Sequence, residues 1–388
     1  MGCGGSPQQE VATLRIGVIA PFSGDYAALG DSVRNGVVLA VETWGAQGGI
    51  LGQPVQVVIE DSQCDYLQGR AAAQAALDKG AVFLIGAVCA TASEGVAQVV
   101  SEASAPGGGV FGEEGVLGGN PRGALQISPA SVDAGLTLDA DGEVRPQVFR
   151  VPLTDGAQGG AAARYAREQM GAERAAILYA AGSSYGQTLA DSFAAAFRDA
   201  GGEIVATDTY DQNAAQFFEE LEGVRDRDPD LLYLPGYAAV VNLLVSQARS
   251  FGVLAPVLGS DGWDSAALDL PVMNGNAFTT HYYGDDPSSA VRAWETRFKE
   301  RFLTAPDALA TMSYDATRLL FTAIVETGVV DPVLVAKTLE TLRFEGVSGS
   351  MSFDELHDPI RSMIVLRVDG GQVRFAGRYG ASPDDAAE

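Results

Sequence analysis

Short apolar runs alternate with amphipathic stretches along the first ninety residues. The run Leu14–Ala20 is almost continuously apolar, which is typical of a strand buried on both faces of a sheet. Residues 30–47 then place apolar side chains at helical spacing, and two glycines end that stretch. A second strand pattern, a second helix pattern and a third strand pattern follow at 55–60, 66–79 and 81–86. This order predicts a βαβαβ unit with parallel strands and right-handed connections.

The same pattern restarts at Arg174. Strand, helix, strand, helix and strand patterns follow one another at 174–179, 187–200, 203–207, 211–227 and 231–234. The repetition predicts two similar α/β lobes, and a turn-rich break at 151–156 separates them without a long flexible linker, so we expect hinged lobes. Further on, the sequence predicts helices at 287–303, 313–327 and 333–342 and strands at 349–353 and 363–368.

Charge and composition restrict the class of partner. The 388 residues include 50 acidic and 25 basic side chains, a formal net charge of −25, which disfavours binding to nucleic acid and docking of the folded body onto anionic lipid. No apolar run approaches the ~18 to 20 residues of a membrane span. A Gly-rich stretch at 106–124 interrupts the first lobe and is interpreted as a surface insertion.

Motifs for catalysis, metals and nucleotides are missing from the sequence. Neither His281 nor His357 lies near a second metal ligand in the sequence, and no P-loop, dinucleotide fingerprint or hydrolase elbow occurs. Abundant carboxylates without a recognisable pairing are typical of a solvated surface. We therefore expect no metal, no cofactor and no enzymatic activity.

The three cysteines differ in their surroundings. Cys3 lies among Gly and Ser residues at the start of the chain, as the lipidated cysteine of a processed bacterial lipoprotein does; an incidental cysteine in a flexible terminus is the alternative. Cys64 and Cys89 are two buried thiols or one bridge, and an exported protein favours the bridge.

Polar and aromatic residues recur just after the predicted strands. Thr91, Tyr185, Tyr237 and Asp261 all take such positions, and ligands of open parallel sheets bind at strand carboxyl ends. Each tyrosine by itself is as well explained by core packing, but together the positions favour a binding cleft between the lobes. A lone carboxylate such as Asp261 in that cleft is suited to a ligand ammonium group.

Four segments, at 16–65, 81–93, 184–205 and 229–237, resemble the periplasmic Leu/Ile/Val-binding proteins, the type I solute-binding components of ABC importers. The resemblance extends from about residue 14 to 377. It implies an α/β fold of two doubly wound, Rossmann-like lobes joined by a three-crossover hinge. It also implies a Cys64–Cys89 disulfide, a small-molecule ligand, a membrane permease as partner, a monomer, and a location in the periplasm or at the cell surface.

The resemblance further implies domain limits. The first lobe comprises 14–153 and 282–347, and the second comprises 154–281 and 348–380. Residues 1–13 then form a spacer of the lipoprotein type, which carries the proposed anchor at Cys3, and residues 381–388 form an acidic tail.

The ligand-contacting positions of that family match only in part. Asp261 falls on an acidic ammonium acceptor and Ala130 on a backbone carbonyl acceptor, whereas Ala90 and Val132 replace hydroxyl residues that bind the ligand carboxylate, and Leu29 replaces an aromatic residue. The hydroxyls of Thr91 and Ser131 are candidates to receive the carboxylate instead. The aromatic positions of the site correspond to Tyr185, Tyr237 and Tyr314.

Four hypotheses follow. The first is capture of a small amine-bearing ligand, foremost a branched-chain or other apolar amino acid, for delivery to a permease. The second keeps the fold and changes the ligand to an aromatic carboxylate, an amide or another metabolite, since two hydroxyls are lost. The third is a ligand-sensing module. An enzyme is the fourth, because doubly wound folds host many chemistries.

Overall fold

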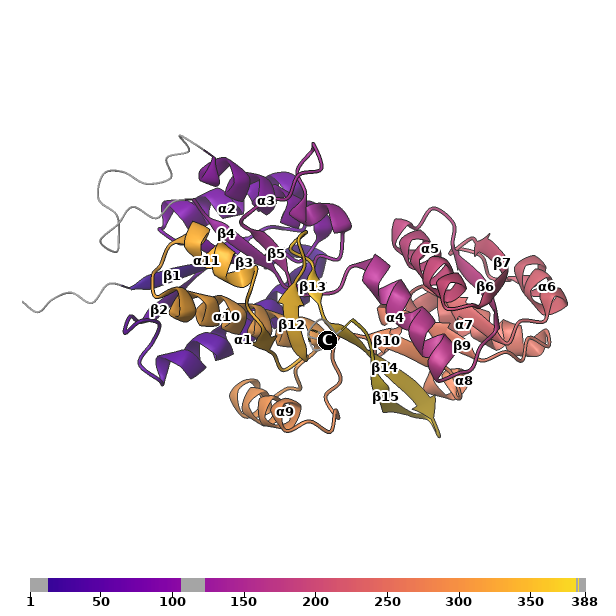
Figure 1. Ribbon diagram of the computed structural model, residues 1–388. Helices are drawn as coiled ribbons and strands as arrows, with labels where there is room; N and C mark the ends of the chain where they lie inside the picture. Colours follow the sequence, from indigo (N-terminus) through magenta and orange to yellow (C-terminus); the bar gives the residue numbers. More distant parts are fainter. Residues whose placement is uncertain (1–12, 106–122, 382, 384–388) are drawn as a thin grey trace, which may run out of the picture.

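The computed structural model describes residues 13–105, 123–381 and 383, and within them the chain forms two lobes connected by several segments (Figure 1). The proposed lipid anchor Cys3, most of the Gly-rich insertion and most of the acidic tail lie outside the described residues. The two-lobed α/β architecture predicted from the sequence is confirmed.

The first lobe is built on a parallel sheet of five strands in the order β2-β1-β3-β4-β5. Alternate side chains of β1 enter opposite layers: Ile16 and Val18 pack toward α1 and α10, whereas Ile19 packs toward α2 and α3. The strands are β1 (Leu14–Ala20), β2 (Val55–Asp61), β3 (Phe83–Gly86), β4 (Leu125–Ser128) and β5 (Val148–Arg150). The helices are α1 (Ala27–Gly45), α2 (Tyr66–Asp78), α3 (Ala90–Ser104), α9 (Ser289–Phe302), α10 (Ala308–Thr327) and α11 (Pro332–Leu339).

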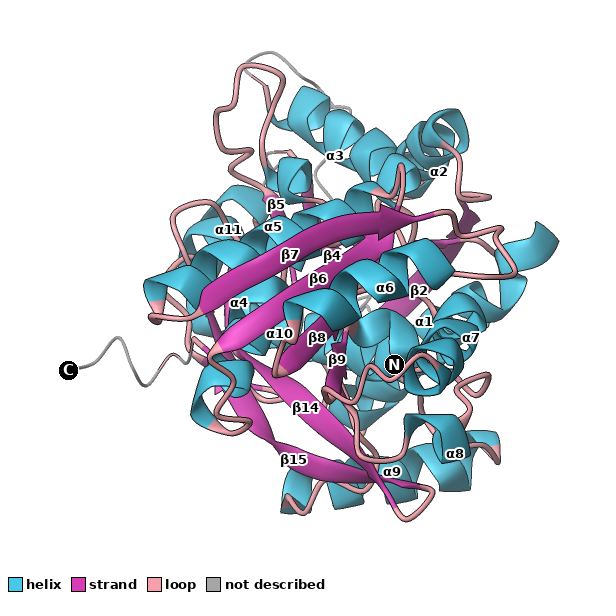
Figure 2. Cartoon of the chain, turned by 90° about the vertical axis from the view of Figure 1, so that its right-hand side faces the viewer, coloured by secondary structure: helices cyan, strands magenta, loops and turns pink. Residues whose placement is uncertain are grey.

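The second lobe is built on a mixed sheet of seven strands in the order β15-β14-β10-β9-β8-β6-β7, and Figure 2 faces this lobe. Its two faces carry separate apolar cores, one under α6 and α7 and the other under α4 and α5. The strands are β6 (Arg174–Ala180), β7 (Glu203–Tyr210), β8 (Leu231–Leu234), β9 (Val257–Gly259), β10 (Ala277–Thr280), β14 (Ser362–Asp369) and β15 (Gln372–Gly380). The helices are α4 (Asp155–Glu168), α5 (Ser184–Asp199), α6 (Phe218–Arg227), α7 (Ala238–Ser250) and α8 (Leu270–Met273).

A small antiparallel sheet lies where the lobes meet, and it moves one predicted boundary. It contains β11 (Phe344–Glu345), β12 (Ser350–Phe353) and β13 (Pro359–Ile360). The sequence assigned 348–360 to the second lobe, but Met351 and Phe353 pack into the core of the first. The third crossing between the lobes therefore falls near Arg361.

The three crossing segments are tied together by buried polar groups. Arg361 is 1% exposed and donates to the carbonyl oxygens of Val151, at 3.2 Å, and Ser348, at 2.7 Å. Arg378 donates to the same Ser348 oxygen, at 3.0 Å, and to Asp286, at 2.8 Å. Because Val151, Asp286 and Arg361 belong to three different crossings, these contacts hold all of them in one hinge.

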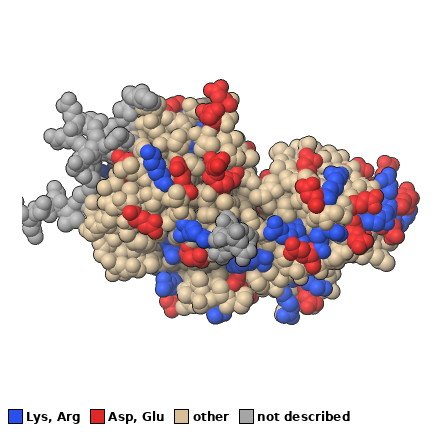
Figure 3. All heavy atoms as spheres, in the orientation of Figure 1, with Lys and Arg blue, Asp and Glu red and all other residues tan. Residues whose placement is uncertain are grey.

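No single helix in the described part of the chain is long and apolar enough to span a membrane. The helices α10 and α11 reach that length and apolar content only as a pair bent by 106°. On the face drawn in Figure 3, acidic side chains lie on the outside of both lobes and are interspersed with lysines and arginines.

Cys64 and Cys89 form a disulfide in the first lobe, with their Cα atoms 5.2 Å apart. The bridge connects the loop before α2 to the residue that precedes α3, over a sequence separation of 25 residues. It therefore fixes the amino-terminal ends of two neighbouring helices.

We expect the double variant Cys64→Ser/Cys89→Ser to lose about 3 kcal/mol of unfolding free energy, because the unfolded chain gains the entropy of an open loop of this size. Urea unfolding followed by circular dichroism measures the loss. Dithiothreitol should destabilise the parent protein by the same amount and leave the double variant unchanged. An unchanged unfolding midpoint of the parent protein in dithiothreitol would show that the bridge does not contribute.

Candidate ligand-binding site

The carboxyl edge of the second-lobe sheet brings together three residues predicted from the sequence. Tyr185 follows β6 at the start of α5, Tyr237 follows β8, and Asp261 follows β9. Since β6, β8 and β9 are parallel neighbours, their carboxyl ends lie at one edge of the sheet. Sequence positions 76 residues apart therefore become direct neighbours.

The side chain of Tyr185 contacts both of the others. The Tyr185 hydroxyl donates to Asp261 Oδ1 at 2.5 Å, lies 2.8 Å from Ser260 Oγ, and accepts from the Gly262 N–H at 3.1 Å. The rings of Tyr185 and Tyr237 stack with their centroids 5.2 Å apart. Tyr237 is 57% exposed, so this aromatic wall faces solvent and is accessible to a ligand.

Asp261 is held in its ionised form. Burial by itself would raise the pKa of Asp261, but His281, Tyr185 and Gln158 stabilise the carboxylate and lower the pKa below its ordinary value. Its Oδ2 atom lies 3.6 Å from His281 Nε2, and the side chain remains 24% exposed. A partly open carboxylate beside two aromatic rings can bind an ammonium group.

Two residues that the sequence did not predict support Asp261. Gln158 of α4 accepts from the Asp261 N–H at 2.9 Å and from the Thr279 hydroxyl at 2.7 Å, which fixes the turn after β9. His281 directly follows β10, the parallel neighbour of β9, so it reaches the same edge. Its position directly after a strand was the signal for it in the sequence.

Asp155 is a third unpredicted residue, and it lies where the first crossing enters α4. Thr154 caps this helix by accepting from the Ala157 N–H. Burial, together with the negative charges of Asp261 and Asp133, raises the pKa of Asp155 to about 7, and Arg150 opposes the shift. Its Oδ1 atom is buried without a hydrogen-bond partner among the described residues. The charges that raise the pKa of Asp155 thus come from both lobes.

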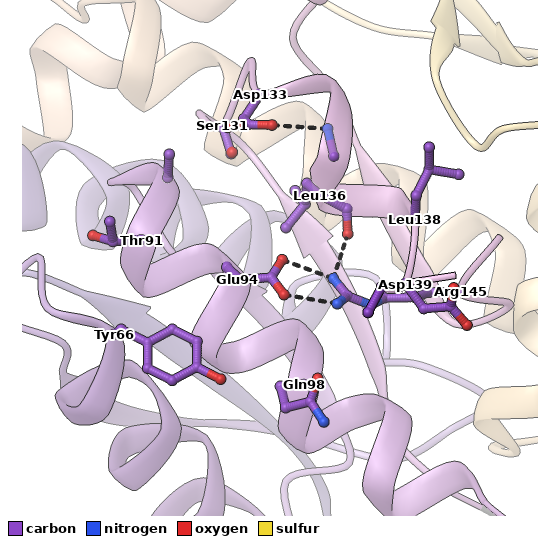
Figure 4. A pocket seen from close by; sticks show the side chains of 13 residues that line it. Tyr66, Thr91, Glu94, Gln98, Ser131, Asp133, Leu136, Leu138, Asp139 and Arg145 are labelled. Carbon is purple, nitrogen blue, oxygen red and sulfur yellow. Dashed lines mark hydrogen bonds and ion pairs between the residues drawn. The ribbon is translucent and has the colours of Figure 1, made fainter. Parts of the chain in front are cut away.

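The first lobe carries a pocket of about 490 Å³ next to the amino-terminal end of α3 (Figure 4). Ala90, Thr91 and Ser131, three of the predicted site residues, line it. Ser131 is 2% exposed, and its hydroxyl has no partner among the described residues, whereas the Thr91 hydroxyl donates to the Cys64 carbonyl at 3.1 Å. Of these two hydroxyls, that of Ser131 is therefore the one whose proton is not already donated.

An arginine on the far wall of the same pocket is already paired. Arg145 donates to both oxygens of Glu94, at 2.7 and 2.8 Å, and to the Leu136 carbonyl at 2.9 Å (Figure 4). Asp133 and Asp139 also line the pocket. The wall of the first lobe is consequently acidic or neutral toward a ligand.

The remaining predicted residues are placed differently. Ala130 and Val132 flank Ser131 and are both half-buried, and Leu29 lies in the first turns of α1 and is 37% exposed. Tyr314 is only 5% exposed, because its ring packs against Trp294 with centroids 4.3 Å apart. The structure thus gives Tyr314 a packing role between α10 and α9, and its contact with a ligand stays a prediction.

The two half-sites belong to different lobes, and Tyr237 is not covered by the first lobe in this structure. Within the described ranges, no group of three or more His, Cys, Asp or Glu side chains is arranged to hold a metal ion. The arrangement is suited to enclosing a small molecule between two walls.

We expect Asp155→Asn to stabilise the protein increasingly as pH rises from about 4 to about 7, and by a constant amount above that. The pKa of Asp155 is raised to about 7 in the folded protein from an ordinary value of 3.8, so the parent protein loses stability between these two pKa values and remains penalised above them. The gain at pH 8 should be about 1 to 3 kcal/mol in urea unfolding.

Asp191→Asn, a matched change at an exposed position of α5, is the control and should leave the pH dependence unaltered. The same pH dependence for Asp155→Asn and Asp191→Asn would show that the pKa of Asp155 is not raised in the folded protein.

Three comparisons with known proteins agree with this arrangement. A sequence model of the family described as periplasmic binding protein matches residues 13–372. The Leu/Ile/Val-binding protein BraC3 of Rhizobium johnstonii is 30% identical over 308 residues, covering 79% of this chain and 74% of that protein.

Solved structures are similar over almost the whole chain. The leucine binding protein LivK of Thermotoga maritima superposes with a TM-score of 0.72 at 28% identity, covering 96% of this chain and all of that one. A solute-binding protein of an ABC transporter from R. palustris, in complex with benzoate, has a TM-score of 0.70 at 21% identity, covering 96% and 98% of the two chains. The chain therefore belongs to the periplasmic binding protein family.

Proposed function

We propose that this protein captures a small amine-bearing molecule between its lobes and delivers it to the permease of an ABC importer, acting as a monomer. Two half-sites on separate lobes and a hinge of three crossings support this function. The family supplies the periplasmic location, and the disulfide fits an oxidising compartment. Attachment to the membrane through a lipid on Cys3 is part of the proposal.

Capture works by closure of the lobes. A ligand bound to one wall of the open form gives no preference for closing, because only contacts made additionally in the closed form shift the equilibrium. Here Asp261 and Tyr237 lie on one lobe and Ser131 lies on the other. A ligand that bridges them stabilises the closed form, which is the form that we expect the permease to recognise.

The ionised Asp261 beside the Tyr185–Tyr237 stack is the observation that carries the amine specificity. An ammonium group satisfies the carboxylate, and an apolar side chain covers the rings. Because BraC3 and LivK are named for leucine or for Leu/Ile/Val, a branched-chain or other apolar amino acid is the first candidate.

A ligand of another class is the second candidate, and two positions favour it. Ala90, the first residue of α3, and Val132 offer no side-chain hydroxyl to a ligand carboxylate. The R. palustris protein, which has a similar fold, is in complex with benzoate, so this architecture accommodates ligands other than amino acids.

We expect Asp261→Asn to weaken binding of the best amine ligand at least tenfold, because a charged hydrogen bond in a partly buried site is worth about 1.5 to 3 kcal/mol. Isothermal titration calorimetry with a panel of apolar amino acids, their amides and benzoate measures it. Asp191→Asn on the outer face of the same lobe should bind like the parent protein. Equal affinity of Asp261→Asn, or binding of benzoate alone, would contradict the proposed amine specificity.

A further inference from the structure

The two half-sites and the crossing between them hold more negative charge than one ammonium group requires. Asp261 lies on the second lobe, Asp155 begins α4 at the first crossing, and Asp133 lines the pocket of the first lobe. Asp155 is destabilised in its ionised form by both other carboxylates. An arriving positive charge therefore relieves a repulsion that the protein itself maintains.

The neighbouring arginines balance this charge only in part: Arg150 opposes the rise in the pKa of Asp155 without cancelling it. Arg150 is fully buried, with Nε 2.6 Å from Asp358 Oδ1, and it donates to the Ala134 carbonyl at 3.1 Å. Arg145 is 5% exposed and paired with Glu94. An anionic group on the ligand would meet carboxylates and only neutral donors: the Ser131 hydroxyl and the first N–H groups of α3.

A second observation, separate from the charge, is that polar atoms without hydrogen-bond partners lie near the same carboxylates. Gln158 and Tyr233 are both fully buried, yet Gln158 Nε2 and the Tyr233 hydroxyl have no hydrogen-bond partner within the described residues. Of the two ring nitrogens of His281, Nε2 is paired with Asp261 and Nδ1 has no hydrogen-bond partner there. Gln158 reaches Asp261 through its amide oxygen, His281 lies 3.6 Å from Asp261, and Tyr233 feels the charges of Asp261 and Asp155.

Buried polar groups without partners are costly, so their convergence on one place indicates that polar groups of a ligand complete them. Asp155 Oδ1 accepts, Gln158 Nε2 donates, and the Tyr233 hydroxyl can do both. This set suits a second polar group on the ligand, one that carries its own N–H donors, beside the ammonium group at Asp261.

We propose that the preferred ligand is a small organic cation without a free carboxylate, with an ammonium group at Asp261 and a neutral amide in place of the acid. The amide N–H groups bind Asp155, and its carbonyl oxygen accepts from the neutral donors of the first lobe. The inference rests on the proposed function, capture of an amine between the lobes, and narrows the ligand class. Amino-acid amides with apolar side chains are the simplest molecules of this kind.

The test compares matched pairs that differ only in that group. Calorimetric titration at pH 7.5 uses glycine, alanine, valine, leucine and phenylalanine and the amide of each, and the pair that binds best is carried forward. We expect the amide to bind at least tenfold more tightly than its parent amino acid. The corresponding alkylamine, which lacks the carbonyl group, should fall below the amide.

Variants then assign the preference to residues. Asp155→Asn should bring the ratio of the two affinities within about threefold of one, whereas Asp261→Asn should weaken both ligands and Asp191→Asn neither. Ala90→Ser/Val132→Thr adds hydroxyl donors to the first lobe and should improve the amino acid more than the amide.

The outcomes separate the two proposals. If the amino acid binds as tightly as its amide or more tightly, the inference is overturned and the proposed amine capture stands. If no member of any pair binds, or Asp261→Asn changes nothing, the proposed function itself fails. A tenfold preference that survives Asp155→Asn would refute the role of Asp155.

Discussion

The carbonyl oxygen of Ser348 is the point on which the two-lobed arrangement depends. It accepts from Arg361 and from Arg378, and these arginines in turn hold Val151 and Asp286. The N–H and hydroxyl groups of Ser348 both donate to the fully buried Asp315. Burial lowers the pKa of Arg361 to about 10, which still leaves it charged at neutral pH, and such a buried charge is tolerated only while its partners stay in place. These contacts therefore give the hinge one specific geometry.

The hinge allows the lobes to move while each wall of the site stays rigid. A single domain would have to combine rigidity and movement in one body. Each lobe builds its own wall rigidly, at the carboxyl edge of its own sheet, and the crossings alone need to change conformation when the lobes approach. In the second lobe Tyr185, Asp261 and Gln158 are locked together by hydrogen bonds. Such a wall keeps its geometry in the open form, so a ligand meets a preformed surface.

The acidic residues fall into two groups in the structure. Most acidic side chains visible in Figure 3 lie on the outside, mixed with basic ones, where they are well solvated. Asp155 and Asp261 differ from these, because one is a strained acid and the other is held ionised by its neighbours. A count of charges along the sequence does not separate the two groups, since the distinction depends on burial and neighbours.

The order of elements could be predicted well from the sequence, whereas several boundaries could not. Helix α6 begins at Phe218 rather than at 211, because Asp211 accepts the N–H of Asn213 and forms a turn there. Helix α10 begins five residues before the predicted 313, at Ala308, since Asp307 caps it through the Ala310 N–H. The hydrogen bonds of Asp211 and Asp307 set where these two helices begin. The spacing of apolar residues along the sequence does not reveal such bonds.

The sequence alone indicated the family and the strand-end positions of Tyr185, Tyr237 and Asp261, because apolar periodicity and local motifs are properties of contiguous residues. The Cys64–Cys89 disulfide was implied by the resemblance to that family, and the structure contains it. Only the tertiary structure decided that Tyr314 packs against Trp294, that 348–360 join the first lobe, and that Asp155, Gln158 and His281 gather around Asp261. The physical reason is distance along the chain: Asp155 and Asp261 are more than a hundred residues apart, and their mutual repulsion arises only when the hinge and the sheet edge bring them together.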